Sequence, residues 1–316
     1  MRIQFKILIG VSLIGGIAFI FILNAYMGPT FIARNNQVFG DYETLFASVR
    51  SSKQQRSIEP IATPPHATTS FTDTFNTSST VQESGELSNS TNPNWWISSG
   101  AYFYSASGVG STIQGSLSIL NPWRVAFSLS NPLDTDNGYH PQNIFRLVST
   151  NSKWQNFRQE AYFQIVQNNL SGSPNRNASN GLLFFNRYQD AYNLYYTGIR
   201  VDGAIVIKKK MNGTYYTLAY KPFYIGPLVY NRDTTPNLIP NNQWVGLRSE
   251  VRTNPDNTVN IKIYIDKNKT GNWILAADAT DDNKTYGGNA IVNEGYAGLR
   301  TDFMDVLFDD YKITGL

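Results

Sequence analysis

The feature that most limits what this chain can fold into is an alternation of apolar and polar side chains, which recurs in short runs from Phe71 onward. In residues 259–265, Val, Ile, Ile and Ile alternate with Asn, Lys and Tyr, which is the period of a strand that buries one face. Residues 204–207 and 215–219 are also strand-like, and Asn212-Gly213 between them favours the positive φ angles of a tight hairpin turn. The pattern predicts strands joined by tight turns.

Strands account for nearly the whole segment after residue 70. The further predicted strands are 116–120, 124–129, 157–166, 182–186, 192–199, 244–252, 296–303 and 306–313. Clusters of Gly, Asn, Pro and Asp separate them, and no helical period longer than two turns is found. The sequence therefore predicts an all-β fold, an antiparallel sandwich of two sheets over residues 71–316.

The composition excludes several kinds of site. Aromatic residues make up 14% of the chain, with 19 Tyr and 18 Phe, which favours strands. The chain has no cysteine, so disulfides, thiol catalysis and zinc sites with cysteine ligands are excluded. The net charge of +3 comes without a long basic stripe, and we expect no nucleic-acid partner.

An uncharged run at residues 7–23 precedes the strand-rich segment. With residues 24–27 it is about 20 residues long, enough to cross a hydrocarbon core of roughly 30 Å as a helix. Arg2 and Lys6 precede the run, while only Arg34 follows closely, so the positive-inside rule keeps the amino end in the cytoplasm. The alternative, a cleaved signal peptide, fits less well because the run is long and no good cleavage site follows.

The chain is therefore predicted to have four parts. Residues 1–6 are a cytoplasmic N-terminus, 7–29 a transmembrane anchor, 30–70 a stalk with a short helix and a Pro- and Thr-rich tether, and 71–316 the β domain. This organisation predicts a single-pass protein of the cell membrane whose C-terminal domain is extracytoplasmic.

Several short motifs follow one another in an order that resembles a known superfamily. They are Phe71-Thr-Asp-Thr-Phe75, Trp95-Trp96 with Ser99-Gly100, Asn180-Gly-Leu-Leu-Phe-Phe185, Asn242-Gln-Trp244, Ile263-Tyr-Ile-Asp266 ahead of Trp273, and Phe308-Asp-Asp-Tyr311. In this order they resemble the concanavalin A-like lectin/glucanase jelly rolls of the laminin G-like branch. The resemblance implies two curved sheets with a concave face, on a fold shared by carbohydrate binders, glycoside hydrolases, polysaccharide lyases and adhesion modules. The fold alone therefore does not decide the function.

Strand alternation assigns polar side chains of three predicted strands, 157–166, 244–252 and 296–303, to one face each. If these strands are neighbours on the concave sheet, their side chains line a groove suited to sugars, with aromatic rings to stack and Arg forks to pair. The candidate carbohydrate-binding residues are Arg158, Glu160, Tyr162, Gln164, Trp244, Arg248, Glu250, Arg252, Arg300 and Asp302. The alternative is a solvated face whose charges pair across strands.

Lyase chemistry is a second possibility. Arg248-Ser-Glu-Val-Arg252 is similar to a strand of alginate-lyase-type jelly rolls, and Gln164-Ile-Val166 to another element of them. The resemblance implies that Arg248, Arg252 and Gln164 would neutralise a uronate carboxylate. The two elements occur in reverse order, Val166 replaces a histidine, and the late Tyr-Phe-Lys-Ala-Gly strand is absent, which puts this chemistry in doubt.

Hydrolase signatures are missing. No Glu-x-Asp-x-x-Glu string of the laminarinase type and no Gly-x-Ser-x-Gly elbow is present. His140 is the only histidine of the β domain, and its surroundings, Asn137-Gly-Tyr-His-Pro-Gln142, indicate a loop.

Calcium is the one cofactor that the sequence suggests. Terminal strands of such sandwiches often pair, which would bring Asp73 near Asp310, and carboxylate oxygens suit calcium. The alternative is that these residues cap turns.

Three lysines, Lys208 to Lys210, end a predicted strand. Neighbours alternate faces on a strand, so we interpret the run as a solvated edge that discourages further strand pairing. A contact with an anionic glycan is the alternative.

Together these features predict a membrane-anchored surface module that binds carbohydrate or another envelope component, without catalysis. The alternatives are a polysaccharide lyase of the uronate type or a glycoside hydrolase, and a purely structural or adhesive envelope domain.

Overall fold

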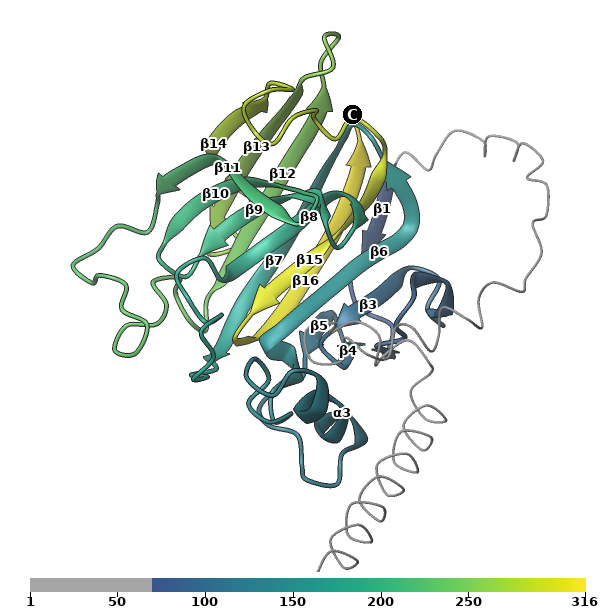
Figure 1. Cartoon of the computed structure of the whole chain (residues 1–316), viewed down its shortest axis with the longest axis vertical. Coiled ribbons are helices and arrows are strands. Elements are labelled where there is room, and N and C mark those ends of the chain that lie inside the picture. The colour runs from purple at the N-terminus through teal and green to yellow at the C-terminus, as the bar shows by residue number, and fades with distance from the viewer. Residues whose placement is uncertain (1–69) are drawn as a thin grey trace, which may run out of the picture. The chain divides into compact units, whose positions relative to one another are not determined.

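A computed structural model describes residues 70–316, which form two antiparallel β-sheets stacked face to face (Figure 1). The predicted all-β sandwich is therefore confirmed. The cytoplasmic N-terminus, the transmembrane anchor and the stalk predicted before residue 70 lie outside the described residues. Within residues 70–316, no helix has the length and the apolar character needed to cross a membrane.

One sheet, here called sheet A, has nine strands. In order of hydrogen-bonded neighbours it consists of β14 (Ile274–Asp281), β13 (Val259–Lys267), β12 (Trp244–Thr253), β7 (Phe157–Asn168), β16 (Met304–Gly315), β5 (Val109–Thr112), β4 (Tyr102–Ala106) and β2 (Ser79–Gln82), with β1 (Ser70–Asp73) paired to β16.

The second sheet, sheet B, has seven strands. Their order is β11 (Thr214–Pro222), β10 (Ala204–Met211), β9 (Asn193–Arg200), β8 (Gly181–Asp190), β15 (Gly295–Asp302), β6 (Ile144–Trp154) and β3 (Trp95–Ser99). The described helices are short: α3 (Pro122–Ser130) and the 3-10 turns η2 (Leu87–Asn89) and η3 (Pro141–Asn143).

The core lies between the sheets. Ile261, Ile263 and Ile265 of β13 are fully buried, as the alternation predicts. The rings of Phe163 from sheet A and Phe184 from sheet B pack across the interface, 5.6 Å between centroids. Because each fully buried side chain of this size contributes about 1.5–3 kcal/mol, the inward faces supply most of the stability of the sandwich.

Most predicted strands are confirmed, and so is the hairpin turn. Asn212 and Gly213 have φ angles of 50° and 85° and join β10 to β11. The predicted strands 157–166, 182–186, 192–199, 244–252, 296–303 and 306–313 coincide with β7, β8, β9, β12, β15 and β16.

Two predicted strands are wrong. Residues 116–120 form no strand, and residues 124–129 lie in the helix α3. Asn121 caps this helix by accepting a hydrogen bond from the Trp123 backbone N–H, and Pro122 fits its first turn. The buried positions Trp123, Ala126 and Phe127 have helical spacing, which the alternation of apolar residues in this segment obscured.

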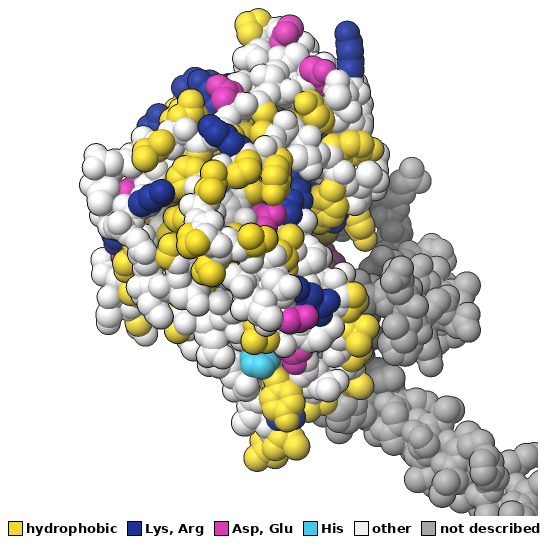
Figure 2. Space-filling model, turned by 90° about the vertical axis from the view of Figure 1, so that its left-hand side faces the viewer, with side chains coloured by type: hydrophobic (Ala, Val, Ile, Leu, Met, Phe, Trp, Pro, Cys, Tyr) yellow, Lys and Arg dark blue, Asp and Glu magenta, His cyan; other side chains and the backbone are white. Residues whose placement is uncertain are grey.

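Apolar side chains gather on the surface at the end of the domain where α3 lies (Figure 2). Leu120 is 89% exposed and Leu129 is 59% exposed, whereas Phe127 is buried. The helix therefore packs Trp123, Ala126 and Phe127 inward and leaves Leu129 exposed, beside the exposed Leu120 that precedes the helix.

The interpretation of the lysine run as a solvated edge is wrong. Strand β10 pairs with β9 on one side and β11 on the other, so it is not an edge strand. Lys209 points into the core, where it is fully buried and its Nζ lies 2.9 Å from Oδ2 of Asp281 on sheet A. The alternation within the run is correct, since Lys208 and Lys210 are half-buried on the other face.

Candidate functional site

Two of the three strands that carry predicted site residues are neighbours in sheet A. In the β7–β12 pair, Arg248 lies opposite Glu160, Glu250 opposite Arg158, and Trp244 opposite Gln164. The polar residues predicted on these two strands therefore share the outer face of sheet A, and the neighbouring phenyl rings of β7 point into the core.

Most charges on this face are paired with one another. Nη2 of Arg158 lies 2.5 Å from Oε1 of Glu250, and Nε of Arg248 lies 2.6 Å from Oε2 of Glu160. The Arg248 guanidinium also lies over the Trp273 ring, 4.1 Å from its centroid. Cross-strand pairing, the alternative that the sequence left open, therefore accounts for these four charges.

Two more predicted residues on this face, Tyr162 and Arg252, differ in their surroundings. Tyr162 donates a hydrogen bond to Asp266, 2.8 Å away, and burial together with this bond raises the pKa of Tyr162. Arg252 at the end of β12 is exposed. Of the residues that the lyase resemblance implies, Arg248 is already engaged by Glu160, which leaves it less available to a uronate.

Arg300 and Asp302 lie elsewhere. Their strand β15 belongs to sheet B, between β8 and β6, so they do not join the residues of sheet A. Nε of Arg300 donates to both carboxylate oxygens of Asp302, at 3.0 and 3.1 Å. Alternation had assigned them to one face of their strand, but it does not say to which sheet a strand belongs.

The Arg300–Asp302 pair forms part of a groove on the outer face of sheet B, here called the sheet-B groove. Its volume is about 480 Å³, within the range of ligand sites. The lining side chains that matter below are Ile144, Leu183, Val206, Arg146, Lys208, Arg300, Asp302, Tyr196, Tyr215, Asp134, Asn175 and Asn177. Ten of these twelve were absent from the list of candidate carbohydrate-binding residues, although a contact of the Lys208 to Lys210 run with an anionic glycan was the alternative interpretation of that run.

A glycine in strand β9 explains why the floor of the sheet-B groove is open. Gly198 of β9 lies in register between Leu183 of β8 and Val206 of β10, so no side chain stands between these two apolar residues. Loops add the polar rim: Nδ2 of Asn175 donates to Asp134 at 3.0 Å, which ties the loop after β7 to the loop after α3. The groove has an apolar floor and a charged and amide-rich rim.

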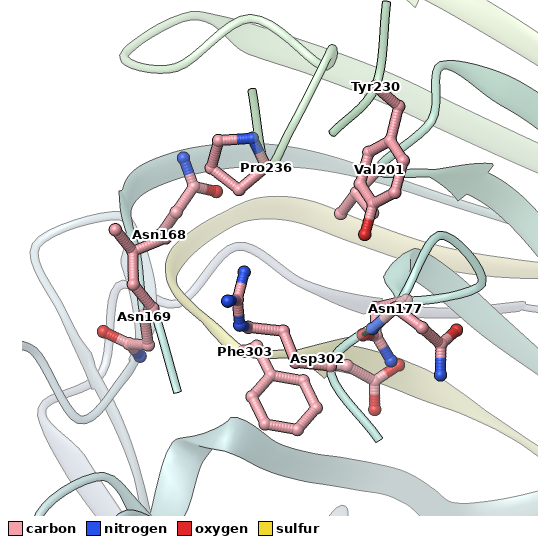
Figure 3. A pocket seen from close by; sticks show the side chains of 11 residues that line it. Asn168, Asn169, Asn177, Val201, Tyr230, Pro236, Asp302 and Phe303 are labelled. Carbon is pink, nitrogen blue, oxygen red and sulfur yellow. Dashed lines mark hydrogen bonds between the residues drawn. The ribbon is translucent and has the colours of Figure 1, made fainter. Parts of the chain in front are cut away.

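A smaller pocket adjoins the groove and shares Asn177, Asn180, Asp302 and Phe303 with it. Figure 3 shows Tyr230 and Pro236 on one side of this pocket and Asp302 and Phe303 on the other. Its volume of about 10 Å³ is room for a single water.

Two tyrosines stand beside the Arg300 guanidinium. Nη1 of Arg300 donates to the Tyr196 hydroxyl at 3.1 Å, and the rings of Tyr196 and Tyr215 are 5.8 Å apart. Burial raises the pKa of Tyr196 to about 12. Burial acts in the same direction on Tyr215, but the charges of Arg300 and Lys210 outweigh it and lower the pKa of Tyr215 to about 8. The Tyr215 side of the groove is therefore electropositive.

The two predicted calcium ligands, Asp73 and Asp310, interact with different side chains. Strand β1 pairs with β16 as expected, but Asp73 lies opposite Tyr311 and accepts hydrogen bonds from Phe75 N and Trp95 Nε1. Asp310 lies 3.0 Å from Nζ of Lys269. The part of the chain that the structure describes holds no cluster of three or more His, Asp or Glu side chains suited to a metal. Calcium binding stays a prediction.

His140 lies in the loop before η3, and it links two other side chains. Its Nε2 is 3.0 Å from Oγ of Ser116, and its Nδ1 is 3.1 Å from Oδ2 of Asp136. Asn143 donates to the same Asp136 oxygen at 2.9 Å. Ser116 is exposed, and the side chains of His140 and Asp136 are 22% and 27% exposed. The sequence showed the loop but not this contact across 24 residues.

No family model matches the chain, and no curated protein is similar to it. Among solved structures, a carbohydrate-binding module, CBM66 of Bacillus subtilis, is 18% identical with a TM-score of 0.37, covering 54% of this chain and 82% of the module. A Bacillus subtilis protein of unknown function with a galectin-like fold is 12% identical, TM-score 0.37, covering 70% and 89%.

An endo-β-1,4-glucuronan lyase of Trichoderma reesei is 7% identical with a TM-score of 0.32, covering 70% of this chain and 87% of the lyase. At such TM-scores the description of the fold rests on the strand pairing of this chain itself. The resemblance to the concanavalin A-like superfamily stays a prediction.

Proposed function

We propose that this chain is a glycan-binding module whose ligand lies in the sheet-B groove. The observation that carries the proposal is the groove itself, an open trench of about 480 Å³ with an apolar floor and a dense polar rim. Sugars present both kinds of surface, since their C–H faces are apolar and their hydroxyls need donors and acceptors.

The rim supplies donors and acceptors in fixed positions. Asp302 is held by Arg300, and Asp134 is held by Asn175, so these carboxylates keep their orientation without a ligand. Tyr215, 50% exposed, offers a ring face at one side of the groove. Side chains fixed in advance lose little conformational freedom on binding.

The proposal includes display outside a cell membrane and the concanavalin A-like jelly-roll interpretation of residues 71–316. The uncharged run 7–23 behind Arg2 and Lys6 supports the first. The order of the motifs between Phe71 and Tyr311 supports the second.

The test is a glycan array probed with the full chain in detergent. Tyr215→Ala removes the ring face and should weaken binding of the glycans found by about tenfold, which corresponds to about 1.4 kcal/mol. Tyr104→Ala is the matched control, because Tyr104 is similarly exposed (42%) but lies on sheet A. The Tyr104→Ala variant should bind the same glycans with the affinity of the wild type.

Two results would contradict the proposal. If no glycan on the array binds the chain, the proposal that it is a glycan-binding module is wrong. Loss of binding in Trp244→Ala with normal binding in Tyr215→Ala would place the ligand on the outer face of sheet A instead.

A second candidate function is ester hydrolysis, favoured by the contacts of His140. With its Nδ1–H donating to Asp136, the His140 ring has Nε2 free to accept the Ser116 hydroxyl proton. Ser116 Oγ would attack an ester carbonyl, His140 would pass the proton to the departing alcohol, and water would then release the acid from the acyl-serine. It ranks second because Ser116 is exposed, where water competes for each of these contacts.

Hydrolysis of p-nitrophenyl acetate by the full chain tests this candidate. Ser116→Ala should reduce the rate to that of buffer, and a fluorophosphonate probe should label the wild type only. Ser118→Ala, which changes an exposed serine of the same loop, is the control. Equal rates in the wild type and Ser116→Ala would contradict this candidate and would mean that the contacts of His140 with Ser116 and Asp136 only stabilise the loop.

A further inference from the structure

Two cations of the sheet-B groove lack an acidic partner. Arg146 of β6 and Lys208 of β10 line the groove, and neither forms an ion pair or a side-chain hydrogen bond with any other described residue. Both are half-buried. Partly burying a charge without a partner costs free energy, so such a pair calls for an explanation.

Other positive charges lie near Arg146 and Lys208. Arg146 lies opposite Arg300 in the β6–β15 pair, and Arg300 already holds the Asp302 carboxylate. Burial, followed by the charge of Arg200, lowers the pKa of Lys208, and the opposing charges of Tyr215 and Asp202 do not offset this effect. Against the effect of burial, the charges of Arg300 and Lys210 also lower the pKa of Tyr215 at this groove.

The outer face of sheet A shows the contrast. There Arg158 and Arg248 each have a glutamate on the neighbouring strand at 2.5–2.6 Å. The same chain therefore neutralises the half-buried arginines of β7 and β12 by cross-strand pairing, whereas it leaves two half-buried cations of sheet B without an ion pair in the described part of the chain. Arg252 of β12 also forms no ion pair with a described residue, but it is exposed.

We propose that the glycan bound in the sheet-B groove is acidic, with carboxylates that pair with Arg146 at one side of the groove and with Lys208 at the other. This inference rests on the proposed function. The planar fork of Arg146 can hold two carboxylate oxygens, and Lys208 adds a compact charge from the opposite side of the groove. A uronic acid residue supplies such a carboxylate on a ring that Tyr215 can contact.

The experiment compares each acidic oligosaccharide with its carboxyl-reduced form. Oligogalacturonates, oligoglucuronates and oligomannuronates are titrated into the full chain in detergent, each beside the neutral sugar of the same stereochemistry. We expect the best acidic ligand to bind at least about tenfold more tightly than its reduced form, and less tightly as salt rises. Arg146→Gln and Lys208→Met should each abolish most of this preference, because they weaken binding of the acid far more than binding of the reduced sugar.

Lys262→Gln is the matched control, since it removes one positive charge from sheet A. It should keep the preference for the acid. Dextran sulfate at equal charge should not displace the oligosaccharide, and displacement would show unspecific attraction instead of a carboxylate site.

The outcomes separate the two proposals. Equal binding of acidic and reduced sugars, with both lost in Tyr215→Ala, would overturn the acidic ligand and keep glycan binding in the groove. Binding of no glycan at all would overturn the proposed function together with this inference. Normal acid preference in both Arg146→Gln and Lys208→Met, two independent variants, would also overturn it.

Discussion

At the scale of single residues, Lys209 carries its ammonium group into the interior between the sheets. Its Nζ lies 2.9 Å from Oδ2 of Asp281 and donates to the backbone oxygens of Gly288 and Asn289. The Tyr195 hydroxyl donates to the same Asp281 oxygen at 2.7 Å, and burial followed by the charge of Asp281 raises the pKa of Tyr195. These groups satisfy one another, so the pair links sheet B to sheet A.

Lys209→Met should lower the free energy of unfolding by about 3–5 kcal/mol, because it leaves the Asp281 carboxylate buried without its cation. Urea denaturation of the full chain in detergent, followed by tryptophan fluorescence, measures the loss. Adding Asp281→Asn should recover much of it, since the uncompensated charge is then gone.

Lys221→Met on β11 is the control, because Lys221 is exposed. It should change the free energy of unfolding by less than about 0.5 kcal/mol. A Lys209→Met variant as stable as this control would show that the buried ion pair contributes nothing to stability.

At the scale of elements, helix α3 depends on its first residues. The Asn121 side chain accepts the Trp123 N–H at 2.9 Å, and Pro122 follows directly. These residues are a recognisable start signal for a helix, yet Val125, Phe127 and Leu129 also alternate as in a strand. The same residues therefore fit both a helix and a strand, and the cap at Asn121 favours the helix.

Asn121→Ala should therefore destabilise α3 by about 1 kcal/mol, since a backbone N–H loses its acceptor. Asn121→Asp keeps a cap acceptor and should remain within about 0.5 kcal/mol of the wild type. Hydrogen exchange of the α3 amides reads out the difference. Equal exchange in the two variants would mean that packing of Trp123 and Phe127, and not the cap, holds the helix.

The sequence predicts most strands of the groove individually, but not their arrangement in the sheet. The sequence places Tyr196 and Arg300 on predicted strands, and the structure confirms β9 and β15 there. Strand periodicity does not show that the two strands are separated only by β8. A groove built across six strands and two loops therefore leaves no local signal in the sequence.

At the scale of the whole molecule, the two sheets differ in how they treat charge. Sheet A pairs Arg158 and Arg248, its half-buried arginines on β7 and β12, whereas sheet B gathers Arg146, Lys208 and Arg300 around an open groove with two tyrosines. One face of the sandwich therefore neutralises its half-buried arginines, and the other presents a positively charged groove. The positively charged face is the one to which the proposals assign a ligand.

The sequence by itself determined the fold class, the hairpin at Asn212-Gly213 and the faces of most strands, because periodicity and turn chemistry act over a few residues. Only the tertiary structure decided which strands share a sheet, because pairing depends on contacts between segments far apart in the chain. That choice separated Arg300 from Arg248, the packing of the two sheets buried Lys209 against Asp281, and the packing of two loops brought Ser116 to His140. The two contacts join residues 72 (281 − 209) and 24 positions apart, beyond the reach of any local pattern.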